Sequence, residues 1–438
     1  MSGLARENAA LARACPGDAA TPQPVQTYYD GAHLFSADAA TRLGAAALSA
    51  LDEYAPDGKT LAEATGLGAD QANQTPFADD IRRRVVEKLR AQPIEDYRID
   101  FEDGYGTRPD DEEDGHAVSV AEAVAAGFEQ GTLPASIGIR MKPLSKELHA
   151  RSLRTLDLFV STLARRLRRR LPPRFVVTIP KVMTAAHVGI VDRACGALER
   201  RLKLRPRSIG IEIMVETPQS ILAVDGTSAM RTLVAAGRGR VIGAHFGVYD
   251  YTALSGITAA WQHMRHPVCD FARHLMQVAL AQSGVRLSDG GTNVMPMPPH
   301  APAQGRQLTR IEREENRKAV HRAWKIHFDG VTHSLINGYY QGWDLHPAQL
   351  PTRYAAVYGF FQSARPAATA RLRAFVEKAS RATLVGEVFD DAATGQALLN
   401  FFVRGLNSGA MTAEEGAETG LSRDELSGSF LQILEGRK

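Results

Sequence analysis

Two acidic residues that follow apolar runs are the strongest chemical signal in the chain. Glu216 ends the run SIGIEIMVE, and Asp250 comes shortly after RVIGAHF. Both runs have the composition of buried parallel strands, whose carboxyl ends meet at one edge of a sheet. Carboxylate oxygens without cysteine or histidine partners suit a hard divalent cation. The pattern therefore predicts that Glu216 and Asp250 together hold a metal ion.

Other polar residues also occur where predicted strands end. Arg140, Lys181 and Glu102 supply a guanidinium, an ammonium and a further carboxylate. In barrel enzymes, catalytic groups gather at the carboxyl ends of the strands, so we expect these side chains to share one site. The remaining polar residues at strand ends are Asp100, Asp103, Glu212, His346 and Gln349.

Each of these residues also has a purely structural interpretation. Glu216 could cap the helix that follows it, and Asp250 could be a turn residue. Arg140 could pair with a neighbouring barrel acid, and His346 could equally be a structural histidine. We favour a functional role for the first three, whereas Lys181 is open between the two interpretations.

The favoured residues point to one type of reaction. A divalent metal held by two carboxylates keeps positions open for water and for a substrate such as a 2-oxo acid. Such a metal acts as a Lewis acid that stabilises an enolate, and Arg140 would hold the developing oxyanion. No serine or cysteine lies in a nucleophile motif such as GxSxG, which disfavours a covalent hydrolase. We therefore expect an enzyme that makes or breaks a carbon–carbon bond beside a carbonyl group.

Strands must position these groups, and the chain offers eight strand-like runs that alternate with helical stretches. This alternation is the pattern of an α/β protein with a (β/α)₈ TIM barrel. A doubly wound open sheet is the alternative, but no Gly-rich dinucleotide turn supports it. The expected strands are Val25–Tyr29, Tyr97–Glu102, Ser136–Met141, Phe175–Pro180, Ser208–Val215, Val241–Phe246, Thr292–Met295 and Gly342–Leu345.

Three regions follow one another along the chain. We expect a flexible N-terminal tail at 1–20, the catalytic TIM barrel at 21–350, and a C-terminal helical extension or lid at 351–438, where only helical patterns appear. An exposed apolar face on this extension would favour a homo-oligomer, with a trimer or hexamer as the expected state. The apolar residues of that face are Leu398, Leu399, Phe401 and Phe402.

Composition narrows the class of protein. Of 438 residues, 44% are hydrophobic and 23% charged, which is ordinary for a globular protein with a large core. The net charge of +3 gives no reason to expect nucleic acid as a partner. Cys15, Cys195 and Cys269 form no CxxC pair, which argues against a zinc site and fits the reducing cytoplasm. Neither a secretory signal nor a membrane span is expected.

Six motifs, taken in order, resemble those of the citrate lyase β-subunit-like, or HpcH/HpaI, aldolase family, which includes malyl-CoA lyases. Each motif is weak by itself, but six in register between Tyr97 and Leu350 are a specific signal. The resemblance implies a TIM barrel, a Mg²⁺ ion with Mn²⁺ as the alternative, and a Claisen or aldol-type lyase reaction. The motifs are IDFEDGYG, IGIRM, TIPKV, IEIMVETP, GAHFGVYDY and GWDLHPAQL.

Carried over by position, the resemblance assigns roles to individual residues. It places the metal ligands on Glu216 and Asp250 and the enolate-stabilising arginine on Arg140. The family's acidic motif falls on Glu102 and Asp103.

The resemblance also extends to the C-terminal region. In CoA-using members, an aspartate from this region closes over the site of a neighbouring subunit. The segment LVGEVFDDAATGQALL places it at Asp390, with Asp391 as the substitute. The sequence departs from the family where Met141 and Lys142 follow Arg140, so the substrate and the use of CoA are left open.

The sequence thus predicts a Mg²⁺-dependent carbon–carbon lyase that acts on a hydroxy acid or a hydroxyacyl-CoA through a metal-stabilised enolate. Its ligands would be small molecules, namely a 2-oxo acid, a hydroxy acid or a CoA thioester. An acyl-CoA thioesterase or synthase on the same scaffold is one alternative. A non-catalytic binding protein with a decayed barrel is the other.

Overall fold

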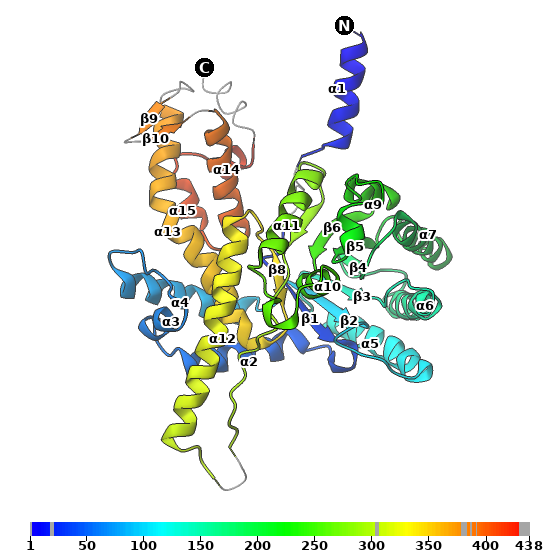
Figure 1. Cartoon of the computed structure of the whole chain (residues 1–438), viewed down its shortest axis with the longest axis horizontal. Coiled ribbons are helices and arrows are strands. Elements are labelled where there is room, and N and C mark those ends of the chain that lie inside the picture. Colours follow the sequence, from blue (N-terminus) through cyan, green and yellow to red (C-terminus); the bar gives the residue numbers. More distant parts are fainter. Residues whose placement is uncertain are drawn as a thin grey trace. The chain divides into compact units, whose positions relative to one another are not determined.

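The computed structural model describes the chain in two compact units, which we call the barrel unit and the helical unit (Figure 1). The barrel unit consists of Met1–Ala47, Leu89–Met295 and Asn337–Gln349, and the helical unit of Leu48–Lys88, Pro296–Ile336 and Leu350–Lys438. The described residues exclude 1, 18–21, 303–305, 378–382, 386–387, 391 and 429–438, together with the side chains of 2, 383–385, 388–390 and 392. The domain limits predicted from the sequence stay predictions.

Eight parallel strands of the barrel unit form a nearly closed TIM barrel, in the order β7-β6-β5-β4-β3-β2-β1-β8. Backbone hydrogen bonds join the segment that follows β7 to β8 and to the residue just before β8. The N–H of Asp289 donates to the carbonyl of Gln341 at 2.8 Å, and that of Trp343 to Gly290 at 3.2 Å. The strands are β1 Gln26–Gly31, β2 Asp96–Asp100, β3 Ser136–Arg140, β4 Phe175–Ile179, β5 Gly210–Val215, β6 Val241–Phe246, β7 Arg286–Ser288 and β8 Gly342–Asp344.

The fold class predicted from the sequence is confirmed, but one strand was placed wrongly. The seventh strand is Arg286–Ser288, whereas the prediction was Thr292–Met295, a segment that runs as a loop. The true strand has only three residues and alternates polar Arg286 and Ser288 around a single leucine. Such a short segment lacks the apolar run by which buried parallel strands are recognised.

Helices follow the strands in the chain, and Figure 1 shows α5, α6 and α7 on the outside of the barrel strands. Four acidic residues occupy the first turn of α5, where they stabilise the positive end of the helix dipole. Gly131 ends the same helix in the left-handed conformation, with φ of 70°. The helices of this unit are α1 Ser2–Ala14, η1 Ala32–Leu34, α5 Asp110–Gln130, α6 His149–Arg166, α7 Ala185–Leu202, α8 Pro218–Ile221, α9 Met230–Ala236, α10 Val248–Leu254, η2 Ala259–Trp261, α11 Pro267–Leu280 and η3 Pro347–Gln349.

The helical unit takes its helices from the first and last thirds of the chain. Two helices, α2 Ala39–Tyr54 and α4 Gln74–Ala91, cross the limits between the units. An antiparallel pair, β9 Thr383–Val385 and β10 Val388–Asp390, interrupts the region in which only helices were expected. The remaining elements are α3 Gly58–Thr65, α12 Arg310–Ile336, α13 Leu350–Glu377, α14 Ala392–Asn407, α15 Ala413–Ala417 and α16 Arg423–Ser427.

The apolar face of α14 is buried within the helical unit, contrary to the sequence-based expectation. Leu398, Leu399 and Phe402 are all buried, and Phe401 lies 5.2 Å from Phe361 of α13, measured between ring centroids. These contacts therefore stabilise the chain's own fold, and of the four residues only Phe401 is partly exposed. The homo-oligomer stays a prediction without this support.

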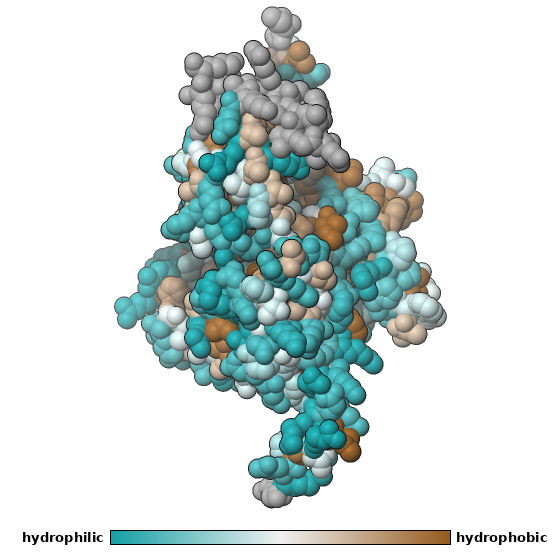
Figure 2. Space-filling view, turned by 90° about the vertical axis from the view of Figure 1, so that its left-hand side faces the viewer, coloured by the Kyte–Doolittle hydropathy of each residue, from teal (hydrophilic) through white to brown (hydrophobic). Residues whose placement is uncertain are grey.

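On the face drawn in Figure 2, apolar residues are scattered among hydrophilic ones rather than joined in one continuous patch. Within the described part of the chain, every helix is too short or too polar to cross a bilayer.

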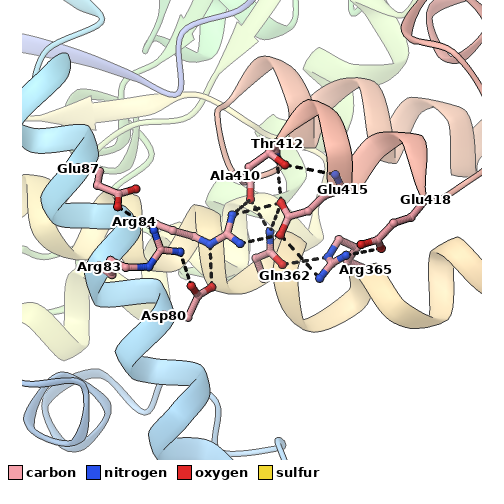
Figure 3. Close-up of polar contacts among 10 residues, drawn as sticks. All are labelled: Asp80, Arg83, Arg84, Glu87, Gln362, Arg365, Ala410, Thr412, Glu415 and Glu418. Carbon is pink, nitrogen blue, oxygen red and sulfur yellow. Dashed lines mark hydrogen bonds and ion pairs between the residues drawn. The ribbon is translucent and has the colours of Figure 1, made fainter.

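An ionic network joins α4, α13 and α15 inside the helical unit (Figure 3). Arg84 contacts Glu415 at 2.6 Å, and the Gln362 amide donates to the other carboxylate oxygen of Glu415 at 3.0 Å. The same Gln362 nitrogen donates to the carbonyl of Ala410 at 2.7 Å. Glu415 thus lies at the centre of the contacts that join three helices.

Candidate active site

The charged residues predicted for the site follow consecutive strands at the carboxyl end of the barrel. Arg140 is the last residue of β3 and lies opposite Asp100, the last residue of β2. Lys181 follows β4 and Glu216 follows β5 directly, while Asp250 lies in the first turn of α10 after β6. The barrel therefore places these side chains at one edge, as expected for parallel strands.

A carboxylate holds Arg140 in a fixed orientation. Its Nε donates to Asp100 Oδ1 at 2.7 Å, and its second terminal nitrogen contacts Asp100 Oδ2. Asp100 also accepts the backbone N–H groups of Glu102 at 2.8 Å and Gly104 at 2.7 Å. The guanidinium lies 5.1 Å from the ring centroid of Tyr29, a cation–π distance. Arg140 thus does pair with a neighbouring barrel acid, which was its structural interpretation. The Nη1 atom of Arg140 faces Glu102 Oε2 at 3.3 Å.

Lys181 is the residue that contacts most of the site's carboxylates. Its ammonium contacts Glu102 Oε1 and lies 3.3 Å from Asp103 Oδ2 and 3.4 Å from Asp250 Oδ2. Its backbone N–H donates to Glu216 Oε1 at 2.5 Å. The sequence left the role of Lys181 open, whereas the structure places it between the acids of three strand ends.

Glu216 and Asp250 form the pair predicted to hold a metal. Glu216 is 1% exposed, and burial together with the charge of Asp250 raises its pKa to about 8. The side chain of Asp250 is 34% exposed and so is open to solvent. A cation between these oxygens would relieve their repulsion, so the donor set fits a hard metal ion.

The number of ligands also bears on the kind of metal. Among the described residues, no three His, Cys, Asp or Glu side chains are grouped to hold a metal ion. A cation here would rely on two carboxylates plus water or substrate. That coordination suits Mg²⁺, which keeps several waters, better than it suits a structural zinc site.

Glu102 combines burial with two cationic neighbours. Burial raises its pKa to about 7, although Arg140 and Lys181 oppose the rise. Its Oε2 also accepts the backbone N–H of Asp103 at 3.0 Å. A carboxyl group with a pKa near neutrality can gain or lose a proton at physiological pH.

Two other polar strand-end residues have structural roles. Glu212 points into the barrel, where its Oε2 accepts from Arg98 at 2.8 Å and from Thr178 at 2.9 Å. Gln349 caps a turn, since its side-chain oxygen accepts the N–H groups of Leu345 at 2.8 Å and His346 at 3.1 Å. Neither residue joins the contacts around Lys181.

The predicted C-terminal aspartate cannot be placed against this site. Asp390 is the last residue of β10, but its side chain lies outside the described residues, as does all of Asp391. Its role stays a prediction.

Sequence reasoning missed the glycine that makes room for Glu216. A Cβ at Gly247 would lie 2.3 Å from Glu216 Oε2 and 2.5 Å from Glu216 Cβ, so only glycine fits without movement. Its place between β6 and the helix that carries Asp250 was the available signal. A glycine between an apolar run and an acid marks a close approach of backbone to a functional group.

An apolar pocket lies on α8, α10 and α11, just after the two metal-ligand candidates in the chain. Its polar groups are the Gln219 amide and the Tyr251 hydroxyl, and no carboxylate, ammonium, guanidinium or imidazole lines it, so it suits an apolar group. Its lining residues are Pro218, Gln219, Ile221, Leu222, Val224, Tyr251 and Phe271.

Comparison with known proteins supports the fold. A family model described as a domain of unknown function (DUF6986) matches residues 4–433, and no curated protein matches the sequence. A citrate lyase structure from Burkholderia xenovorans LB400 matches with a TM-score of 0.56 and 17% identity, over 78% of this chain and 92% of that chain. A Haloferax volcanii malate synthase, solved as a pyruvate and acetyl-CoA ternary complex, matches with a TM-score of 0.45 and 14% identity, over 95% and 99% of the two chains. At such identities, the citrate lyase match shows a shared barrel fold and nothing finer.

Proposed function

The chain belongs to the DUF6986 family, and we propose that it is a Mg²⁺-dependent carbon–carbon lyase acting on a hydroxy acid or hydroxyacyl-CoA. The observation that carries the proposal is the cluster of Arg140, Lys181, Glu216 and Asp250 at the carboxyl end of the barrel. The shared fold with a citrate lyase is compatible with this activity but does not establish it, since one barrel supports many reactions.

Each residue of the cluster has a distinct role in this proposal. Glu216 and Asp250 would hold Mg²⁺, or Mn²⁺ in its place, and the metal would supply Lewis-acid stabilisation of negative charge developing on a substrate oxygen. Arg140 is immobilised by Asp100, so its remaining N–H groups are preorganised to stabilise the same charge. Glu102 can hold or release a proton near neutral pH, because its pKa lies at about 7.

The assay is cleavage of candidate hydroxy acids and hydroxyacyl-CoA thioesters, followed by release of pyruvate, glyoxylate or acetyl-CoA. We expect activity to disappear with a chelator and to return with Mg²⁺ or Mn²⁺. Glu216→Gln should lower kcat by at least about 100-fold, because weaker metal binding removes the Lewis acid that would stabilise the developing charge. Glu147→Gln, at an exposed glutamate of the same unit, is the control and should keep full activity. Turnover that resists chelation, or an unimpaired Glu216→Gln variant, would refute the proposal.

A further inference from the structure

Lys181 adopts a backbone conformation that its residue type disfavours. Its φ is +48°, in the left-handed region, which is unfavourable for a residue with a Cβ atom. Strain of this kind persists at functional sites when the surrounding structure imposes it. The conformation lets one residue act in two directions, since its N–H donates to Glu216 while its ammonium reaches Asp250.

The ammonium is held unequally by its three carboxylates. The contact with Glu102 is the closest, and Asp103 lies 3.3 Å away, both from the chain that follows β2. Asp250 Oδ2, which comes from the first turn of α10 after β6, lies 3.4 Å away. Within the described residues, this is the one ion pair that Asp250 makes. Glu102 and Asp103 can therefore keep the ammonium if Asp250 takes another cation.

We propose that Lys181 is a tethered counter-ion that takes the place of a divalent cation on Asp250, and that the metal binds by displacing it from Asp250 alone. The inference rests on the proposed function for the identity of the two metal ligands. An ammonium on a flexible stem can make this exchange, because it is a compact charge with rotatable donors. The exchange avoids leaving the buried Glu102 without a cationic partner on this side, because an unpaired buried charge is strongly destabilising.

The consequence is that Lys181 limits metal affinity while protecting the metal-free protein. Removing the ammonium removes both a competitor and a nearby positive charge. We expect Lys181→Met to bind Mn²⁺ at least about tenfold more tightly than the wild type. The repulsion between the ammonium and a cation a few ångströms away is large enough near a protein surface to change the affinity by this factor. The metal-free Lys181→Met variant should unfold at a lower temperature, and Mn²⁺ should raise its Tm by more than it raises that of the wild type.

The experiment is titration calorimetry of the full-length chain with Mn²⁺, together with thermal unfolding with and without the metal. Lys203→Met is the matched control, because Lys203 is an exposed lysine with the same left-handed backbone, φ of 55°. It should leave Mn²⁺ affinity unchanged. Lys181→Arg keeps the charge and should bind Mn²⁺ no more tightly than the wild type, which tests the inference even if Lys181→Met fails to fold.

The outcomes separate this inference from the proposed function. Unchanged or weaker Mn²⁺ binding by Lys181→Met, with binding abolished in Glu216→Gln, would overturn the counter-ion role and leave the metal ligands in place. Tighter binding by Lys181→Arg would overturn it as well. Absence of Mn²⁺ binding in the wild type and in Lys181→Met would overturn both the inference and the metal assignment.

Discussion

Burial and a neighbouring negative charge act in the same direction on Glu216. The carboxyl group is buried beside the charged Asp250, and both effects raise its pKa to about 8. Lys181 and Arg140 only partly compensate. A buried acid with such a neighbour is a functional-site candidate on physical grounds, because a fold selected for stability alone would avoid the arrangement.

This pKa predicts how the stability of the metal-free protein depends on pH. Because the folded-state pKa lies above the unfolded value, the folded protein binds more protons between about pH 4.5 and pH 8. The contribution of Glu216 to the free energy of unfolding is therefore fully present at low pH, and it is lost as the pH rises through about 8. In thermal unfolding with a chelator, the wild type should lose Tm relative to Glu216→Gln between pH 6 and pH 8.5. Parallel curves for the two proteins would contradict the assignment, and Glu147→Gln should follow the wild type.

Among the elements, the junction between β6 and α10 positions both metal-ligand candidates. Asp250 lies in the first turn of α10, and Gly247 before it leaves the space that Glu216 fills. On the neighbouring strand, the Thr217 hydroxyl caps α8 through a capping box with Ser220, which fixes the backbone just after Glu216. Two short helices thus determine where the two carboxylates point.

A methyl group at this junction should displace Glu216. Gly247→Ala would place a carbon atom within van der Waals distance of both the stem and the carboxylate of Glu216, so that side chain must move. We expect a loss of about 1–3 kcal/mol of stability from overpacking, together with much weaker Mn²⁺ binding in calorimetry. Gly115→Ala is the control, since Gly115 in α5 has open space around it and alanine favours a helix. Wild-type metal affinity in Gly247→Ala would show that the close approach is unimportant.

At the scale of the whole molecule, the chain builds two compact units from interleaved segments. The helical unit draws on three separate stretches of sequence, so contacts between distant residues must hold it together. Arg84 and Glu415 are 331 residues apart in sequence, and their side chains are only 15% and 12% exposed. Because both side chains are largely buried, removing one partner costs more than it does in an exposed surface ion pair.

Two glutamates near this network give a matched test. Glu415→Gln should destabilise the protein by about 1–2 kcal/mol, because it removes the more buried of the two carboxylates that pair with Arg84, the other being Asp80. Glu418→Gln should cost no more than about 0.5 kcal/mol, since Glu418 is 52% exposed where it pairs with Arg365. Urea unfolding followed by circular dichroism measures both changes. Equal effects of the two substitutions would show that burial does not set the strength of the network.

The sequence by itself determined the barrel and the edge at which its polar residues gather. Apolar runs ending in Glu216 and Asp250 identified two strands correctly, because burial on both faces leaves a local pattern. Strand β7 escaped detection for the converse reason: three residues with Arg286 at their start carry too little pattern.

Only the tertiary structure decided which of these residues meet. Lys181 contacts Glu102 across 79 residues of sequence, Arg140 binds Asp100, and Glu212 turns inward to Arg98. The sequence likewise predicted that the apolar residues of α14 are exposed, whereas three of them are buried in the folded chain. The periodicity of a strand records which faces are buried, whereas pairing between strands arises when the barrel closes, and that closure is a property of the whole chain.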